Sequence, residues 1–174
     1  LATSLMSTSA SDDTKLTASQ AIQKETAASG KPHVNKRGIS KFLDRLEYPV
    51  HFLDFETFGT AIPLFDGVRP YQQVPFQFSL HIVRVSGSKP EHVMFLAEGR
   101  HDPRPKFMLR LRDAIGRQGS IVAFNASFEV GRLRECCEAM PNFSAWLNQV
   151  EGRVVDLLEP FRSFHFWLFW KSSG

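Results

Sequence analysis

The sequence has few of the features that place a protein outside the cell or in a membrane. Its 174 residues include only two cysteines, Cys136 and Cys137, which are adjacent. Neighbouring cysteines rarely bridge each other, and two thiols cannot complete a four-ligand zinc site. We predict reduced thiols on a helix, which fits a reducing, cytoplasmic compartment. The chain also lacks an apolar run of about 18 residues and a charged-then-apolar leader, so we expect no membrane span.

The bulk composition permits many functions and selects none. Hydrophobic residues make up 43% and charged residues 22%, as in an ordinary globular domain. A net charge of +3 with a sequence pI of about 9.0 permits a polyanionic partner without requiring one. The length suits about one domain. Any assignment to nucleic acid therefore has to come from particular residues.

The N-terminal segment, residues 1–36, is rich in Ser, Thr, Ala and Lys and contains few large apolar side chains. Such a segment cannot bury enough surface to offset its ordering entropy, so we predict a disordered lead-in or interdomain linker. Its Ala, Gln, Lys and Glu content is compatible with a helix over residues 15–28. Because the chain begins at Leu1 rather than Met, we expect a piece of a longer polypeptide that can include an upstream domain.

The folded part is expected to start near Gly38. An apolar helical face begins at Ile39, with Ser40 as its expected cap and Pro49 as its stop. Segments rich in β-favouring residues then alternate with segments of helical periodicity. The expected strands are residues 50–57, 76–85, 92–97, 120–125 and 153–156, and the expected helices are residues 102–115, 127–139, 143–150 and a last one from residue 157.

This order of elements predicts an α/β fold. Three consecutive strands form an antiparallel meander, and the two later strands return by right-handed crossovers. The result is a mixed five-stranded sheet with helices on its faces and an incomplete C-terminal helix, which suits the ribonuclease-H-like architecture. We place this domain at residues 38–164, followed by an atypical aromatic tail at residues 165–174.

The first expected strand carries two carboxylates, Asp54 and Glu56, two residues apart. Alternate side chains share a strand face, so both carboxylates point the same way. Two like charges on a central strand repel and are costly to desolvate, and a divalent cation between them removes both costs. The flanking Phe52 and Phe55 are apolar, which favours a buried strand over an edge strand with solvated acids. The pair is therefore predicted to form the first half of a metal site.

A second candidate lies where the fourth expected strand meets the next helix. Glu129 falls in the first turn of that helix, which Ser127 can cap. An acid in this position also favours the helix dipole and needs no metal. The residues alone leave both roles open.

Together these segments resemble a known superfamily. Asp54-Phe-Glu56 looks like the first motif of the DnaQ-like, or DEDD, 3′–5′ exonucleases. The run from Asn125 through Phe128 and Glu129 is similar to their second motif, with Glu129 in place of the usual Asp.

A closer resemblance is to a bacterial family of unknown function, number 2779. Residues 48–57 and 62–82 carry it, and it runs from about Gly38 to Phe164. Within the exonuclease resemblance, Asp156, which lies between Val and Leu, is similar to the acid of an Asp-Thr-Leu run on a later strand of those enzymes. We assign Asp156 a supporting role.

The exonuclease resemblance implies phosphodiester hydrolysis with two Mg²⁺ or Mn²⁺ ions about 4 Å apart. It makes Asp54, Glu56 and Glu129 the catalytic and metal-binding candidates: Asp54 would bridge the ions, Glu56 would bind one and Glu129 the other. The implied substrate is nucleic acid, single-stranded or at its ends.

The resemblance also implies a third motif, with a His or Tyr base and a fourth carboxylate, which this sequence lacks. Residues 161–170 hold aromatic side chains and no acid. We expect a truncated or frame-altered end, and therefore weak or absent activity and poor stability. The alternative is a real aromatic helix that packs on the sheet.

The expected loop over residues 60–74 carries most of the substrate-binding candidates. Tyr71 can stack on a base, Arg69 can contact phosphate, and glutamine side chains can bond base edges. Equally, the glutamines can tie down the backbone of their own loop. The residues proposed for substrate binding are Thr57, Arg69, Tyr71, Gln72, Gln73, Asn125 and Phe128.

Three functions stay open on the sequence. The first is a DEDD-type nuclease, the second a catalytically inactive module of the same fold that binds nucleic acid or protein, and the third a small-phosphoester hydrolase using the same metals. A run of basic residues is expected to form a solvated face rather than to contact phosphate. The histidines have no ligand-like spacing and are expected to be structural or surface groups. The basic run is Arg100, Arg104, Lys106, Arg110, Arg112 and Arg117, and the histidines are His33, His51, His81, His92 and His101.

Overall fold

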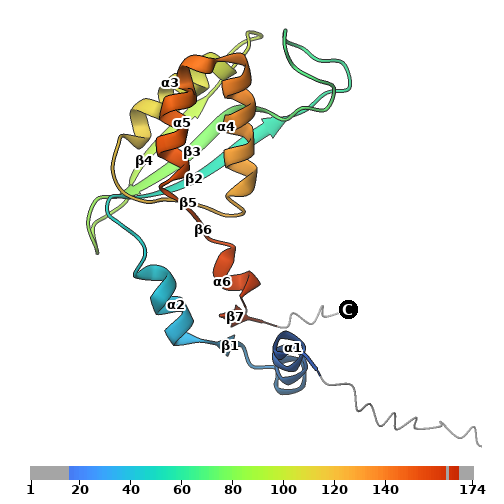
Figure 1. The fold of residues 1–174 in the computed structure, drawn as a ribbon, viewed down its shortest axis with the longest axis vertical. Coiled ribbons are helices and arrows are strands. Elements are labelled where there is room, and N and C mark those ends of the chain that lie inside the picture. Colours follow the sequence, from blue (N-terminus) through green and yellow to red (C-terminus); the bar gives the residue numbers. More distant parts are fainter. Residues whose placement is uncertain (1–15, 164, 169–174) are drawn as a thin grey trace, which may run out of the picture.

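A mixed five-stranded sheet forms the centre of the fold, as predicted (Figure 1). The computed structural model describes residues 16–163 and 165–168. The strands of this sheet are β2 (Val50–Phe58), β3 (Val74–Val83), β4 (Glu91–Leu96), β5 (Ile121–Ala123) and β6 (Val154–Asp156). Their order is β4-β3-β2-β5-β6, in which β2, β3 and β4 form the predicted antiparallel meander and β5 and β6 are parallel to β2.

Three helices cover one face of this sheet (Figure 1). They are α3 (Arg104–Ile115), α4 (Ser127–Ala139) and α5 (Ser144–Glu151), with the short 3₁₀ helix η1 (Pro141–Phe143) before α5. Their apolar sides meet β2 and β3 in a core that includes Leu53, Phe78, Phe107, Leu111 and Leu133. Burial of each such side chain contributes roughly 1.5–3 kcal/mol, so this layer is the main source of stability.

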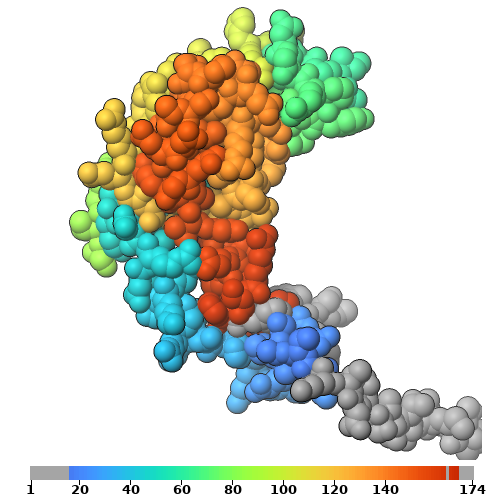
Figure 2. All heavy atoms as spheres, in the orientation of Figure 1, coloured from blue at the N-terminus to red at the C-terminus, as the bar shows by residue number. Residues whose placement is uncertain are grey.

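A second group of elements lies beyond one end of the sheet (Figures 1 and 2). Its members are α1 (Ala18–Ser29), β1 (His33–Val34), α2 (Lys36–Leu43), α6 (Glu159–Arg162) and β7 (Phe166–Trp167). Strands β1 and β7 pair antiparallel in a two-stranded sheet that the sequence did not indicate. Phe42 of α2 packs with Val50, Val122 and Val155 in a small cluster separate from the main core. Since Val50 shares its strand face with Asp54, this cluster covers only one end of the face opposite α3, α4 and α5.

Two helix caps differ from the prediction. Helix α2 begins at Lys36 and is capped by Asn35, whose side chain accepts a backbone hydrogen bond in the first turn, so Ser40 lies inside the helix. Helix α4 has no side-chain cap, because the hydroxyl of Ser127 donates to Asn125 instead. The predictions that Ser40 and Ser127 cap these helices were wrong. Several short polar side chains near a helix start can bond to the same backbone groups, and the local geometry decides which of them does so.

Helix α1 lies within the segment predicted as a linker, close to the helix expected over residues 15–28. Thr17 and Gln20 form a reciprocal capping box at its start. Gly30 ends it in the left-handed conformation, with φ 65°.

The predicted aromatic tail is only partly described. Phe166 and Trp167 form strand β7, so these residues are not in an aromatic helix packed on the main sheet. Residue 164 and residues 169–174 lie outside the described residues, as do residues 1–15. The expectation of a truncated or frame-altered end stays a prediction.

The cysteines and, among the described residues, the lack of a membrane-spanning helix follow the sequence analysis. Cys136 and Cys137 are free, buried thiols on α4, and burial raises the pKa of Cys136 to about 12. Across residues 16–163 and 165–168, no helix combines the length and apolar character needed to cross a membrane.

The turn into β5 depends on a close backbone approach at Gly119. This residue has φ +81°, and a Cβ built on it would lie 1.9 Å from the carbonyl oxygen of Pro49. The next residue, Ser120, donates its N–H to the carbonyl of Glu47 at 2.8 Å, and Arg153 donates to the Gly119 carbonyl at 2.7 Å. The segment before β2 and the turn before β5 are therefore fixed against each other at the backbone.

We expect Gly119→Ala to lower the free energy of unfolding by more than about 3 kcal/mol, because the new methyl group meets rigid backbone. The control is Gly87→Ala, which has a similar φ of +77° but open space around the Cβ position. It should lose only about 1–2 kcal/mol, the cost of the left-handed backbone. Urea unfolding followed by tryptophan fluorescence measures both. Equal losses would show that the contact with Pro49 contributes nothing.

Candidate metal centre

Strand β2 presents its two carboxylates on an open face of the sheet. Leu53 and Phe55 are buried under the helices, whereas Asp54 and Glu56 point to the opposite side and are exposed. The strand is internal, between β3 and β5, as predicted. One face of the strand is nevertheless open: Phe52 is 40% exposed, because no described element covers the middle of this face.

The second candidate, Glu129, lies in the first turn of α4 and is only 5% exposed. Its Oε2 is buried and has no hydrogen-bond partner among the described residues. Burial raises the pKa of this carboxyl to about 7; its own backbone amide opposes the rise, and the negative charges of Asp54 and Asp156 add to it. The charge of Asp54 therefore acts on the carboxyl of Glu129.

Asp156 contrasts with Glu129, because it is well satisfied. Its Oδ1 accepts backbone hydrogen bonds from Asn125, Ala126 and Leu158 at 3.0, 3.3 and 2.9 Å. Its Oδ2 lies 3.4 Å from Arg162. These contacts hold the β5–α4 junction, and the supporting role of Asp156 in the site stays a prediction.

The two other candidates at this junction make local contacts. Asn125 has a left-handed backbone, with φ 61°, and its side-chain oxygen accepts from Ser127 and from Arg162 at 3.0 and 3.2 Å. The guanidinium of Arg132 lies 5.1 Å from the ring centre of Phe128. Asn125 and Phe128 are thus positioned by the protein, and their proposed substrate contacts stay predictions.

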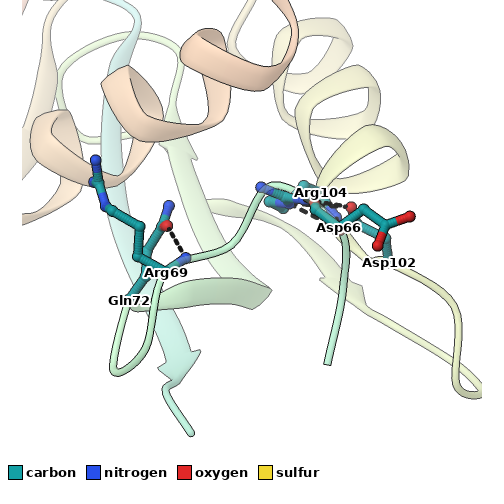
Figure 3. Close-up of polar contacts among 5 residues, drawn as sticks. All are labelled: Asp66, Arg69, Gln72, Asp102 and Arg104. Carbon is teal, nitrogen blue, oxygen red and sulfur yellow. Dashed lines mark hydrogen bonds and ion pairs between the residues drawn. The ribbon is translucent and has the colours of Figure 1, made fainter. Parts of the chain in front are cut away.

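The long loop between β2 and β3 is tied to its surroundings by its own polar side chains (Figure 3). Gln72 accepts a hydrogen bond from the backbone N–H of Arg69 at 2.9 Å. Gln73 accepts from the hydroxyl of Thr57 at 2.8 Å and donates to the carbonyl of Tyr71 at 3.4 Å. Both glutamines therefore make the loop-stabilising contacts that the sequence left open as an alternative.

Arg69 and Tyr71 differ from these glutamines in being largely solvent-facing. The guanidinium of Arg69 lies 3.8 and 3.7 Å from Glu135 and Glu138 of α4, with its side chain 65% exposed. Tyr71 is 71% exposed and has a φ of 61°, an uncommon value for a bulky residue. Exposed ion pairs contribute little, so Arg69 can exchange its partners for another anion.

Arg104 was predicted to belong to a solvated basic face, and this was wrong. Its side chain is buried and pairs with both oxygens of Asp102, at 2.7 and 3.1 Å from Oδ2 and 3.0 Å from Oδ1. It also donates to the carbonyl of Asp66 at 3.0 Å (Figure 3). Arg104 thereby fastens the long loop to the start of α3. The sequence signal for this ion pair was Asp102, an acid two residues before Arg104.

The described residues do not converge fully into a metal site. No three His, Cys, Asp or Glu side chains among residues 16–163 and 165–168 are arranged to hold one ion. The donors nevertheless suit Mg²⁺ or Mn²⁺, which prefer carboxylate oxygen. The buried, unpartnered oxygen of Glu129 is the feature that a cation would satisfy. The residues therefore fit such an ion in their chemistry and in the coupling of Asp54 with Glu129.

These features define an α/β protein with a mixed sheet whose open face carries carboxylates. Over residues 51–173 the chain matches the family described as Domain of unknown function (DUF2779), and it belongs to that family. The matched residues include Asp54, Glu56, Glu129 and most of the aromatic tail. Neither the curated proteins nor the solved structures contain a match to the chain. Membership in this family does not by itself assign an activity to the chain.

The raised pKa of Glu129 makes a prediction about stability. Because the folded pKa of about 7 exceeds the ordinary value of 4.5, the folded state holds the proton more tightly than the unfolded state. Without metal, stability should therefore fall as the pH rises from about 5 to 8, by up to roughly 3 kcal/mol from this group. Glu129→Gln should be more stable than the parent at pH 8 and nearly equal to it at pH 4.5.

Urea unfolding at both pH values in the presence of a chelator measures this effect. The matched control is Glu138→Gln, an exposed acid on the same helix, which should leave the pH dependence unchanged. If the stability of the parent rises steadily from pH 5 to 8, and Glu129→Gln shows the same pH dependence, the carboxyl of Glu129 does not have a raised pKa.

Proposed function

We propose that this chain is a metal-dependent nuclease domain of ribonuclease-H-like fold, of the DEDD 3′–5′ exonuclease type, which hydrolyses phosphodiester bonds of nucleic acid. The observation that carries the proposal is the buried, unpartnered carboxyl of Glu129, held close enough to Asp54 for their charges to interact. The order of the sheet, an antiparallel meander followed by two parallel strands, supports the fold assignment.

The proposed ligands divide between a strand and a helix. Asp54 and Glu56 share one face of β2, and Glu129 lies in the first turn of α4. Bound Mg²⁺ or Mn²⁺ ions would activate water and stabilise the leaving oxygen. Glu129 would give up its proton when a cation binds, and the positive charge of the cation would offset the repulsion between the carboxylates of Glu129 and Asp54. We expect weak turnover from this chain, because the described residues offer these three carboxylates where the proposed type uses four.

The proposed substrate side is the long loop and the β5–α4 junction. Tyr71 offers an exposed ring for stacking on a base, and Arg69 offers a guanidinium whose present partners are solvent-screened carboxylates. Single strands and nucleic-acid ends suit such a site, because their bases can leave the stack and reach an aromatic side chain.

A binding module without catalysis is the second candidate. The lack of a three-ligand group among the described residues favours it, because incomplete ligation lowers metal affinity and leaves a reacting phosphate poorly positioned. In this alternative the open face and the loop hold nucleic acid or a protein without cleaving it.

Metal binding should depend on Asp54 and on Glu129. We expect Asp54→Asn and Glu129→Gln each to weaken Mn²⁺ binding at least about tenfold, as measured by electron paramagnetic resonance of free Mn²⁺. The control Asp113→Asn removes an exposed acid of α3 and should change nothing. Unchanged Mn²⁺ affinity in Asp54→Asn would contradict the metal centre.

Hydrolysis of end-labelled single strands with Mn²⁺ then separates the two candidates. Slow cleavage that disappears in Asp54→Asn supports the nuclease. Strand binding without cleavage by the parent chain, with Mn²⁺ bound, contradicts the nuclease and supports the binding module.

The loop should contribute to strand binding under either candidate. The double substitution Arg69→Ala with Tyr71→Ala should weaken binding of a fluorescent single strand several-fold, because it removes one phosphate contact and one stacking ring. The control Arg117→Ala removes an exposed arginine after α3, away from this loop in the chain. Fluorescence anisotropy with Ca²⁺ in place of Mn²⁺ measures affinity without cleavage. Equal affinities of parent and double variant would remove the loop from the proposed substrate site.

A further inference from the structure

Two histidines lie side by side on the open face of the sheet. His81 of β3 and His92 of β4 are direct cross-strand partners in the antiparallel register. Their rings are stacked, with centroids 4.3 Å apart and planes 14° from parallel. Both side chains are exposed. The pairing was hidden in the sequence because the two residues come from different strands, and both were expected to be ordinary surface groups.

The surroundings of this histidine pair are fixed by the sheet. Phe52 of β2 is the partner of His81 on its other side, and Ser79 and Met94 form the adjoining row of β3 and β4. Asp54 is the direct partner of Ser79, so the histidines occupy the row next to the carboxylate. All of these side chains share the face that α3, α4 and α5 leave uncovered.

Ser79 also orients one of the two rings. Its hydroxyl lies 3.0 Å from Nε2 of His92. In the tautomer in which Nε2 carries the proton, the serine oxygen accepts this hydrogen bond and the lone pair of Nδ1 is directed away from Ser79. A histidine that ligates a metal usually donates its other ring N–H to a polar neighbour, which fixes the tautomer in the same manner.

We propose that His81 and His92 form a two-imidazole clamp for a first-row divalent cation of borderline softness, such as Zn²⁺, Ni²⁺ or Cu²⁺. Imidazole nitrogen is the preferred ligand of these ions. Two nitrogens at about 2.0–2.1 Å from one ion lie roughly 3 Å apart. Both rings would turn out of their stacked arrangement, with centres 4.3 Å apart, so that their in-plane lone pairs point to one ion, and the cross-strand pairing keeps the two side chains adjacent as they turn.

The clamp has two protein ligands and leaves the remaining positions for water or an anionic group. No third His, Cys, Asp or Glu joins it within the part of the chain that the structure describes. The carboxylate centre is chemically different, because its oxygen donors suit Mg²⁺ and Mn²⁺. The clamp is therefore a second site, and it does not depend on the proposed nuclease function.

A Ni²⁺ titration of the full chain by isothermal calorimetry at pH 7.5, after removal of bound metal with a chelator, tests the clamp. We expect one Ni²⁺ per chain in the parent. His81→Ala and His92→Ala should each weaken binding at least about tenfold, and Ser79→Ala should weaken it less, since it removes only the orienting contact. The control His101→Ala removes an exposed histidine outside the pair and should leave the affinity unchanged. His92→Gln, checked for cooperative thermal unfolding, separates loss of the ligand from loss of the fold.

Two results would overturn the clamp. One is Ni²⁺ affinity that His92→Ala and His92→Gln leave unchanged. The other is Ni²⁺ affinity that Asp54→Asn lowers as much as His92→Ala does, which would put the ion on the carboxylates. A parallel Mn²⁺ titration keeps the two sites apart, because the histidine variants should leave the Mn²⁺ behaviour of the parent unchanged, whether the parent binds Mn²⁺ or not.

Discussion

All three helices between β4 and β6 pack against the same face of the sheet, and this one-sided covering decides which side chains remain for chemistry. The core of β2 and β3 lies under α3, α4 and α5, so every second residue of these strands is committed to packing. The alternate residues face solvent, apart from the end covered by Phe42 of α2. Asp54, Glu56 and the histidine pair are accessible for this reason.

The acids near the β5–α4 junction show how burial distinguishes a structural carboxylate from a reactive one. Asp156 is held by three backbone N–H groups and by Arg162, so its charge is used to fix the chain. Glu129 is more deeply buried, keeps one oxygen without a partner and has its pKa raised towards neutrality. A purely structural acid in that position would gain stability from a hydrogen-bond donor to its free oxygen, and none is present among the described residues. This absence of a partner makes Glu129 a functional candidate.

The sequence predicted the parts of the fold that depend on local pattern. The β-favouring residues of β2 identified that strand, and α4 has its predicted bounds. The pairing of β1 with β7 could not be predicted, because two-residue strands carry no periodic signal and their partners are far apart in the chain. The burial of Arg104 was also missed, since its partner Asp66 belongs to a loop whose path only the folded chain defines.

The candidate site was predictable only in its separate halves. Asp54 and Glu56 were recognised from their spacing, but the sequence could not show that Phe52 beside them is exposed, because an apolar strand reads the same whether one face or both are covered. Nor could the spacing of His81 and His92 predict a stacked pair, since the register of β3 against β4 is set by the loop between them.

The left-handed backbone of Tyr71 is explained by the energetics of its loop. A left-handed conformation costs a bulky residue about 1–2 kcal/mol, which packing of its side chain normally offsets. Here the ring is 71% exposed, so packing returns little of that cost. What holds the conformation is the backbone: Tyr71 donates to the carbonyl of Thr60 at 2.8 Å, and Gln73 donates to the carbonyl of Tyr71. These hydrogen bonds of the loop therefore keep an aromatic ring in solvent. The exposed position of the ring therefore follows from the loop backbone and not from packing against the core.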